Sequence, residues 1–192
     1  VEIPEAGSGS TVFRQLFVNG QRRERARWPR EKWFTVAGTA NAKESGWAGR
    51  LSGVEDDEWA RRSFRFRPGD LRPDWANLED AEVVVLQFWM ASRLRIQALD
   101  ERQNSVLFTG GSWRPLTWSF GYYVDNVAAG LSVPGCWYLN RKTGILQYHP
   151  LPGEDLTQAE VIAPETLQLV RVEVHRIPTS SAGRVEPSPD IS

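Results

Sequence analysis

The sequence predicts an all-β fold, an antiparallel β-sandwich or barrel-like domain with long loops and one or two short helices. Short apolar-aromatic runs recur at close intervals and turn residues separate them, as in sandwiches and barrels. No repeat of about 20 to 50 residues is evident, so a solenoid is not expected within the chain. A chain of 192 residues that is 41% apolar and 24% charged ordinarily forms one globular domain, at most two.

The first clear strand signals follow a short N-terminal segment. Residues 1–11 are expected to form a strand end and a flexible Gly-Ser linker. A strand is predicted over 12–18, and Asn19-Gly20 is a strong signal for a two-residue hairpin loop. The return strand is predicted over 21–27, because its arginines alternate with other residues at the period of a strand.

The signal weakens over residues 30–62, where glycines and tryptophans are scattered. This part predicts a long loop, a kind of segment that is often functional, with a short helix around 56–61. A strand over 64–67 is expected to end at Pro68-Gly69. The connection over 70–80 is rich in turn residues and could include one helical turn.

The strongest strand signal is the apolar run over 82–92, whose continuity predicts burial on both faces. Strands over 94–99 and 106–108 are expected to pair through the polar turn at 100–104. A short helix is favoured over 126–131.

The most informative stretch is the hairpin predicted over 136–149. Two apolar-aromatic runs flank the polar turn 140–144, and Gly144 is expected to take the left-handed conformation that a bulge needs. Four side chains are expected to pair across this hairpin and cover a core face: Trp137, Leu139, Leu146 and Tyr148.

The C-terminal part predicts closing strands at 161–162 and 167–174. Residues 175–192 are rich in Ser and Pro with few apolar side chains, which predicts a disordered tail. The β-rich domain is therefore expected to span residues 12–174.

Composition argues against several classes of function. One cysteine cannot form an intrachain disulfide, and with two histidines it cannot supply a usual structural zinc site, so no cofactor is expected. A net charge of −1 removes the electrostatic case for nucleic-acid or anionic-membrane binding. No apolar run is long enough for a membrane span, and the first residues do not resemble a signal peptide.

The stretch Pro-Gly-x-Trp-Tyr-Leu-Asn-Arg-x-x-Gly-x-Leu-x-Tyr at 134–148 resembles a segment common in secreted right-handed parallel β-helix (pectate-lyase-like) proteins, in particular the glycoside hydrolase family 141-like proteins. Further motifs of that group occur in the same order along the chain, at 15–29, 64–71, 77–85 and 122–126. One departure is Cys136, which stands where the group often has Glu.

The resemblance implies an insertion domain near the start of a long β-helix, whose later rungs carry the catalytic carboxylates. No rungs are visible before Ser192. The expected function is a non-catalytic accessory domain of a secreted carbohydrate-active enzyme, extracellular or periplasmic, that shapes a polysaccharide-binding groove. Its expected partners are a polysaccharide or oligosaccharide and the β-helix domain of the parent protein, with no nucleic acid and no membrane.

Two alternatives stay open. Nine tryptophans either fill a β-core or stack on sugar rings, and the second use would suit a free-standing carbohydrate-binding module. A complete small glycosidase would instead need two opposed carboxyl groups. The acidic cluster at 55–58 is expected to be solvated, and Asp70 and Asp80 to serve turns or caps, so no catalytic residue is singled out.

The candidate substrate-binding residues are Arg25, Arg27 and Trp28. A guanidinium can donate paired hydrogen bonds to sugar hydroxyls or to the carboxylate of an acidic sugar, while an indole stacks beside it. The alternative is a strand edge whose arginines simply pair with neighbouring glutamates.

Overall fold

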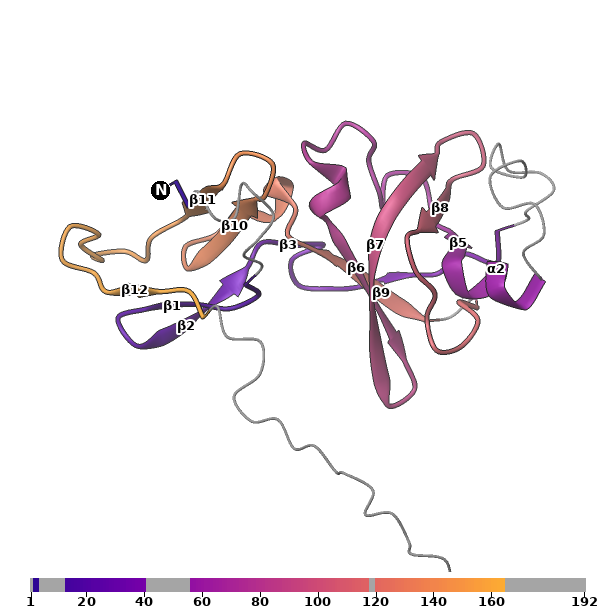
Figure 1. The fold of residues 1–192 in the computed structure, drawn as a ribbon, viewed down its shortest axis with the longest axis horizontal. Helices are drawn as coiled ribbons and strands as arrows, with labels where there is room; N and C mark the ends of the chain where they lie inside the picture. The colour runs from indigo at the N-terminus through magenta and orange to yellow at the C-terminus, as the bar shows by residue number, and fades with distance from the viewer. Residues whose placement is uncertain (1, 4–12, 41–55, 118–119, 165–192) are drawn as a thin grey trace, which may run out of the picture.

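The computed structural model confirms the all-β fold, with two curled sheets and short helical turns between strands (Figure 1). The structure describes residues 2–3, 13–40, 56–117 and 120–164. The expected Gly-Ser linker, the strand over 167–174 and the tail over 175–192 lie outside the described residues.

The first sheet has five strands. In spatial order they are β11 (Ile145–Tyr148), β10 (Cys136–Asn140), β2 (Gln21–Arg25), β1 (Leu16–Val18) and β12 (Val161–Ile162). Neighbouring strands are antiparallel except for the parallel pair β10 and β2. The buried side chains beneath this sheet are Phe13, Leu16, Val18, Trp137, Leu139 and Leu146.

Both hairpins predicted in this sheet are confirmed. Asn19 and Gly20 have positive φ values of 52° and 71°, as a tight two-residue loop requires. In the second hairpin Leu139 pairs with Leu146, and Gly144 has a φ of 71°. Strand β1 starts later than predicted, at Leu16.

The second sheet has seven strands. They are β3 (Arg27–Trp28), β9 (Gly121–Asp125), β6 (Glu82–Gln87), β7 (Met90–Asp100), β8 (Ser105–Phe108) and β5 (Ser63–Arg65), with β4 (Phe34–Thr35) also on β9. The segment that follows β4 lies against β5. There the Arg65 backbone N–H donates to the Gly38 carbonyl at 2.8 Å. The sheet therefore closes on itself like a barrel around a core that includes Phe64, Val83 and Tyr122.

The helical elements are short. They are α2 (Asp56–Arg62), η1 (Leu78–Asp80) and η2 (Ala128–Gly130). Helix α2 confirms the short helix predicted around 56–61, and η1 confirms the helical turn allowed for in the connection over 70–80. The predicted helix over 126–131 shrinks to the single turn η2, because β9 continues to Asp125 and Asn126 turns the chain with a φ of 57°.

The strand predicted over 82–92 is wrong in its length. The chain folds back at Phe88-Trp89, so that β6 and β7 form an antiparallel hairpin in which Gln87 pairs with Met90. The apolar run contains no turn-forming residue, and Phe88 itself takes a positive φ of 46°. The predicted burial of both faces is confirmed for β6, where Val83 and Val84 are both buried.

The return strand predicted over 21–27 is also corrected, because it divides at Ala26. The Ala26 N–H donates to the Trp137 carbonyl of the first sheet at 2.6 Å. The Ala26 carbonyl accepts at 2.8 Å from the N–H of Asn126, which directly follows β9 of the second sheet. The buried Ala26 thus marks the crossing between sheets. Arg25 and Arg27 consequently lie on either side of the junction.

Candidate functional site

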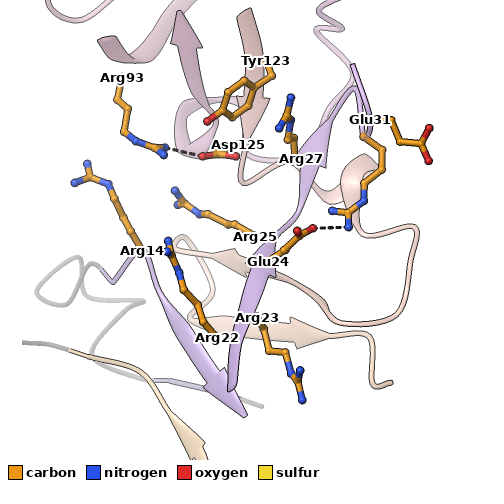
Figure 2. Close-up of a pocket in the computed structure, with 11 residues that line it drawn as sticks. Arg14, Arg22, Arg23, Glu24, Arg25, Arg27, Glu31, Arg93, Tyr123 and Asp125 are labelled. Atoms are coloured by element: carbon orange, nitrogen blue, oxygen red, sulfur yellow. Dashed lines mark hydrogen bonds and ion pairs between the residues drawn. The ribbon is translucent and has the colours of Figure 1, made fainter. Parts of the chain in front are cut away.

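A pocket of about 620 Å³ lies at this junction (Figure 2). Seven of its eleven lining residues are arginines and three are acidic. The lining residues are Arg14, Arg22, Arg23, Glu24, Arg25, Arg27, Arg30, Glu31, Arg93, Tyr123 and Asp125. We call it the arginine pocket. Arg25 and Arg27, expected from the sequence to bind substrate, both line it.

The pocket wall on the barrel side is the outer face of β9, β6 and β7. Val84 of β6 pairs with both Tyr123 of β9 and Arg93 of β7, so these side chains share one face. Glu82 lies directly opposite Asp125 in the same way. The strand register therefore brings two carboxylates side by side at the base of the wall.

Arginines from both sheets converge on these carboxylates. Arg25 donates to Glu82 at 2.7 Å and Arg14 donates to it at 3.0 Å. Arg93 donates to Asp125 at 2.6 Å and lies 3.5 Å from Glu82. Since the side chains of Glu82 and Arg25 are only 3% and 8% exposed, their ion pair is a buried link between the two sheets.

The network holds Glu82 ionised. Burial alone would raise the pKa of Glu82, but the hydrogen bonds and charges of Arg14 and Arg25 outweigh burial and lower the pKa to about 2. Burial also lowers the pKa of Arg25, and its contacts with Glu82 oppose that shift. Both groups remain charged near neutral pH.

Two arginines of the pocket, Arg22 and Arg27, have no carboxylate partner in the described structure. The Arg27 guanidinium lies 3.9 Å from the centre of the Tyr123 ring and 5.9 Å from that of Trp33. It also donates to the Lys32 carbonyl at 3.1 Å, so its position is fixed. By contrast, Arg23 is paired with Glu154 at 2.7 Å and points away from the pocket in Figure 2.

Trp33 does not line the pocket, but its exposed indole lies beside Arg27, with 5.9 Å between the guanidinium and the ring centre. It is 59% exposed, and a Cβ atom on Gly121 would lie 3.1 Å from its ring. The indole thus lies close against the backbone of β9 at Gly121. Flat and rigid, it lies next to the Arg27 guanidinium and could stack on a sugar ring held by that arginine.

Trp28, the third residue expected to bind substrate, does not line the pocket. It packs partly buried against the barrel core, with its ring centre 6.5 Å from that of Trp75. Strand alternation explains the difference, because consecutive residues of β3 point to opposite faces of the sheet. Sequence reasoning also missed Arg14, Arg93 and Asp125, which only the register of distant strands brings to the site.

The carboxylates of the pocket are poorly placed for acid–base catalysis. Asp125 is held by Arg93, Glu24 forms an ion pair with Arg30, and Glu31 points away in Figure 2. Burial raises the pKa of Asp70, but this residue lies in the barrel core, where its carboxylate accepts from the Tyr122 hydroxyl at 2.8 Å. The two opposed carboxyl groups of a glycosidase are therefore not found in the arginine pocket.

Within the described ranges, no group of three or more His, Cys, Asp or Glu side chains is arranged to hold a metal ion. The same part of the chain contains no helix of the length and apolarity needed to cross a membrane.

Comparison with known proteins gives one structural similarity. No family model and no curated protein match the chain. A solved structure described as a glycoside hydrolase superimposes with a TM-score of 0.54 at 23% sequence identity, over 81% of this chain and 27% of that one. The chain therefore has the fold of part of a glycoside hydrolase and spans about a quarter of that protein's length.

Proposed function

We propose that the chain is a non-catalytic domain of a secreted, extracellular or periplasmic, carbohydrate-active enzyme, and that its arginine pocket binds the carboxylate groups of an acidic polysaccharide. One observation carries the proposal: seven arginines surround a single pocket, and in the described structure two of them have no carboxylate partner. The pocket would form one wall of a groove completed by the β-helix domain of a parent protein of the family 141-like kind.

The charge balance of the pocket favours an anionic ligand. Carboxylates from the protein neutralise only part of the arginine charge, and the planar guanidinium fork matches a carboxylate in two parallel hydrogen bonds. Because the Arg27 guanidinium already packs on the Tyr123 ring and donates to the Lys32 carbonyl, little side-chain entropy would be lost when it binds. A uronic acid could place its carboxylate on Arg27 and its ring over Trp33.

The non-catalytic part of the proposal is supported by the state of the carboxylates. Hydrolysis of a glycosidic bond needs one carboxyl group that is protonated and can act as an acid. Glu82, with a pKa of about 2, is ionised and enclosed by arginines. The alternative of a complete small glycosidase gains no support from the pocket.

Replacing Arg27 with alanine is expected to weaken the binding of trigalacturonate about tenfold, because one charge-assisted pair is lost. The affinity of wild type should also fall as salt is added. Isothermal titration calorimetry at low ionic strength measures both effects.

The control ligand is fully methyl-esterified trigalacturonate, which keeps the sugar rings and removes the charge. The control variant is Arg102→Ala, which removes an exposed arginine in the turn between β7 and β8. Equal affinity of the two ligands, or equal weakening by both substitutions, would show that the pocket does not recognise carboxylates.

A further inference from the structure

The arginine pocket contains a carboxylate that is fixed in place and still has one oxygen to offer. Asp125 lines the pocket from the end of β9, and its side chain is only 10% exposed. Its Oδ2 atom accepts from Arg93 at 2.6 Å. Its Oδ1 atom forms no hydrogen bond within the described part of the chain, and it is not enclosed by protein atoms. Asp125 therefore presents an acceptor to the pocket.

Two neighbouring strands and one ion pair hold Asp125. Its backbone pairs with Arg27 of β3 on one side and with Glu82 of β6 on the other. Its side chain is held by the charge-assisted hydrogen bond from Arg93. Because both the backbone and the side chain are already ordered, little conformational entropy would be lost when Oδ1 accepts from a ligand.

The other carboxylates near the pocket do not combine these two properties. Both oxygens of Glu82 are occupied, one by Arg14 and the other by Arg25. The Glu24 side chain is 70% exposed and pairs with Arg30. Glu31 is exposed and points away from the pocket in Figure 2.

A donor without a carboxylate partner lies next to this acceptor. Arg27 is directly opposite Asp125 across β3 and β9, so the two side chains share one face of the sheet. They form no ion pair with each other in the described structure. The Arg27 guanidinium instead packs on the Tyr123 ring at 3.9 Å and donates to the Lys32 carbonyl. Figure 2 shows Arg27, Tyr123 and Asp125 together at one end of the pocket.

This pair of groups selects for a ligand that carries an anion and a hydroxyl together. A guanidinium donates to a carboxylate, whereas a carboxylate oxygen needs a ligand hydrogen and finds one on a hydroxyl. An ionised carboxylate or sulfate has no hydrogen to give, and the charge of Asp125 repels it. A pocket for anionic groups alone would gain nothing from an unoccupied carboxylate oxygen, so the acceptor discriminates against such ligands.

We propose that Asp125 determines the specificity of the arginine pocket: its Oδ1 atom accepts a hydrogen bond from a ring hydroxyl of a uronic acid whose carboxylate is bound by Arg27. This inference rests on the proposed function of the pocket and narrows its ligand. A uronic acid unit carries its carboxylate and its hydroxyls on one ring, so a single unit satisfies both groups. An anion without hydroxyls leaves the Asp125 oxygen unpaired, which lowers its affinity.

The test is calorimetric titration of wild type and Asp125→Asn with trigalacturonate and with tricarballylate. Both ligands carry three carboxylates, but only trigalacturonate carries hydroxyls. Asp125→Asn keeps the size of the side chain and an oxygen for Arg93. It should weaken trigalacturonate binding about tenfold, because a hydrogen bond to a charged acceptor is lost. Tricarballylate should bind at least as tightly as before, since a repelling charge is removed.

The control variant is Glu24→Gln, which removes the same charge from an exposed carboxylate of the pocket. It should strengthen the binding of both ligands, because only repulsion is relieved. The inference is overturned if Asp125→Asn behaves like this control, if it changes both affinities by the same factor, or if it leaves trigalacturonate affinity unchanged. Any of these results would show that Asp125 acts on the charge or shape of the pocket alone.

Wild type alone provides a second measurement that does not depend on the folding of a variant. It should bind trigalacturonate about tenfold more tightly than tricarballylate, and equal affinities would overturn the inference while leaving the pocket as a carboxylate site. Wild type that binds no trigalacturonate at millimolar concentration would overturn the proposed function and the role of Asp125 together.

Discussion

Glu82→Ala is expected to destabilise the folded chain by about 3–5 kcal/mol, because it leaves buried positive charge without compensation. Arg25, whose side chain is only 8% exposed, would lose its carboxylate partner at the junction of the two sheets. Arg14 would lose its hydrogen bonds with Glu82 as well. Urea unfolding followed by tryptophan fluorescence measures the change in the free energy of unfolding.

The matched control is Glu58→Ala, which removes an exposed ion pair with Arg62 at 3.5 Å on helix α2. Exposed pairs of this kind contribute about 0.5 kcal/mol or less. If Glu82→Ala unfolds at nearly the same urea concentration as Glu58→Ala, the buried network is not what joins the sheets.

The same network predicts a dependence of stability on pH. The pKa of Glu82 falls from 4.5 to about 2 on folding, a shift worth about 3 kcal/mol. Since the folded state favours the ionised form, this contribution is fully present above pH 4.5 and is lost as the pH falls toward 2. The stability difference between wild type and Glu82→Gln should therefore shrink between pH 5 and pH 2, and a constant difference would contradict the assignment.

Gly130→Ala is expected to destabilise the chain by about 3 kcal/mol, the upper range for forced overpacking. A Cβ atom at this position would lie 2.6 Å from the carbonyl oxygen of Arg27 and 2.7 Å from its carbonyl carbon. Real Cβ atoms essentially never come within 3.0 Å of such atoms, so η2 or β3 must move. Because the clash is with backbone, no side-chain rotation relieves it.

The substitution should also weaken binding of trigalacturonate, since β3 positions Arg27 in the arginine pocket. Gly110→Ala is the control, because a Cβ atom there meets nothing within 4 Å. Thermal unfolding of both variants measures the loss of stability, and calorimetric titration measures the loss of trigalacturonate affinity. Wild-type stability and affinity in Gly130→Ala would show that the packing of η2 on β3 does not support the site.

Much of the fold could be predicted because its turns carry strong local signals. Asn19-Gly20 and the turn that ends at Gly144 define two hairpins directly. The loop at Phe88-Trp89 could not be predicted, since an apolar pair in that position resembles the interior of a strand. The crossing at Ala26 could not be predicted either, because its backbone hydrogen bonds connect it to Trp137 and Asn126, which are remote in sequence.

The candidate site could be predicted only where a local sequence pattern marks it. Arg25 and Arg27 belong to one local pattern, and both reach the pocket. Arg93 and Asp125 come from strands remote in sequence, and only strand register brings them there. Trp28 was assigned with its arginine neighbours, but alternation along the strand turns it toward the core.

The tryptophans of the described residues differ widely in exposure. Trp59 and Trp137 are buried, as core residues should be. Trp33, Trp89 and Trp113 are exposed, and sugar stacking by such residues stays a prediction. Composition cannot assign these uses, because burial depends on which strands and loops meet in space.

We propose above all that this domain holds an acidic saccharide through its arginines without cleaving it. The most direct test of this proposal is NMR spectroscopy of the arginine Nε–H signals during titration with trigalacturonate, with the sugar spectrum recorded in the same tube. The signals of Arg22, Arg27 and Arg93 should shift together while the saccharide stays intact over days. Arginine signals that do not move would show that the pocket does not bind the saccharide, and new reducing ends in the sugar spectrum would show that the domain cleaves it.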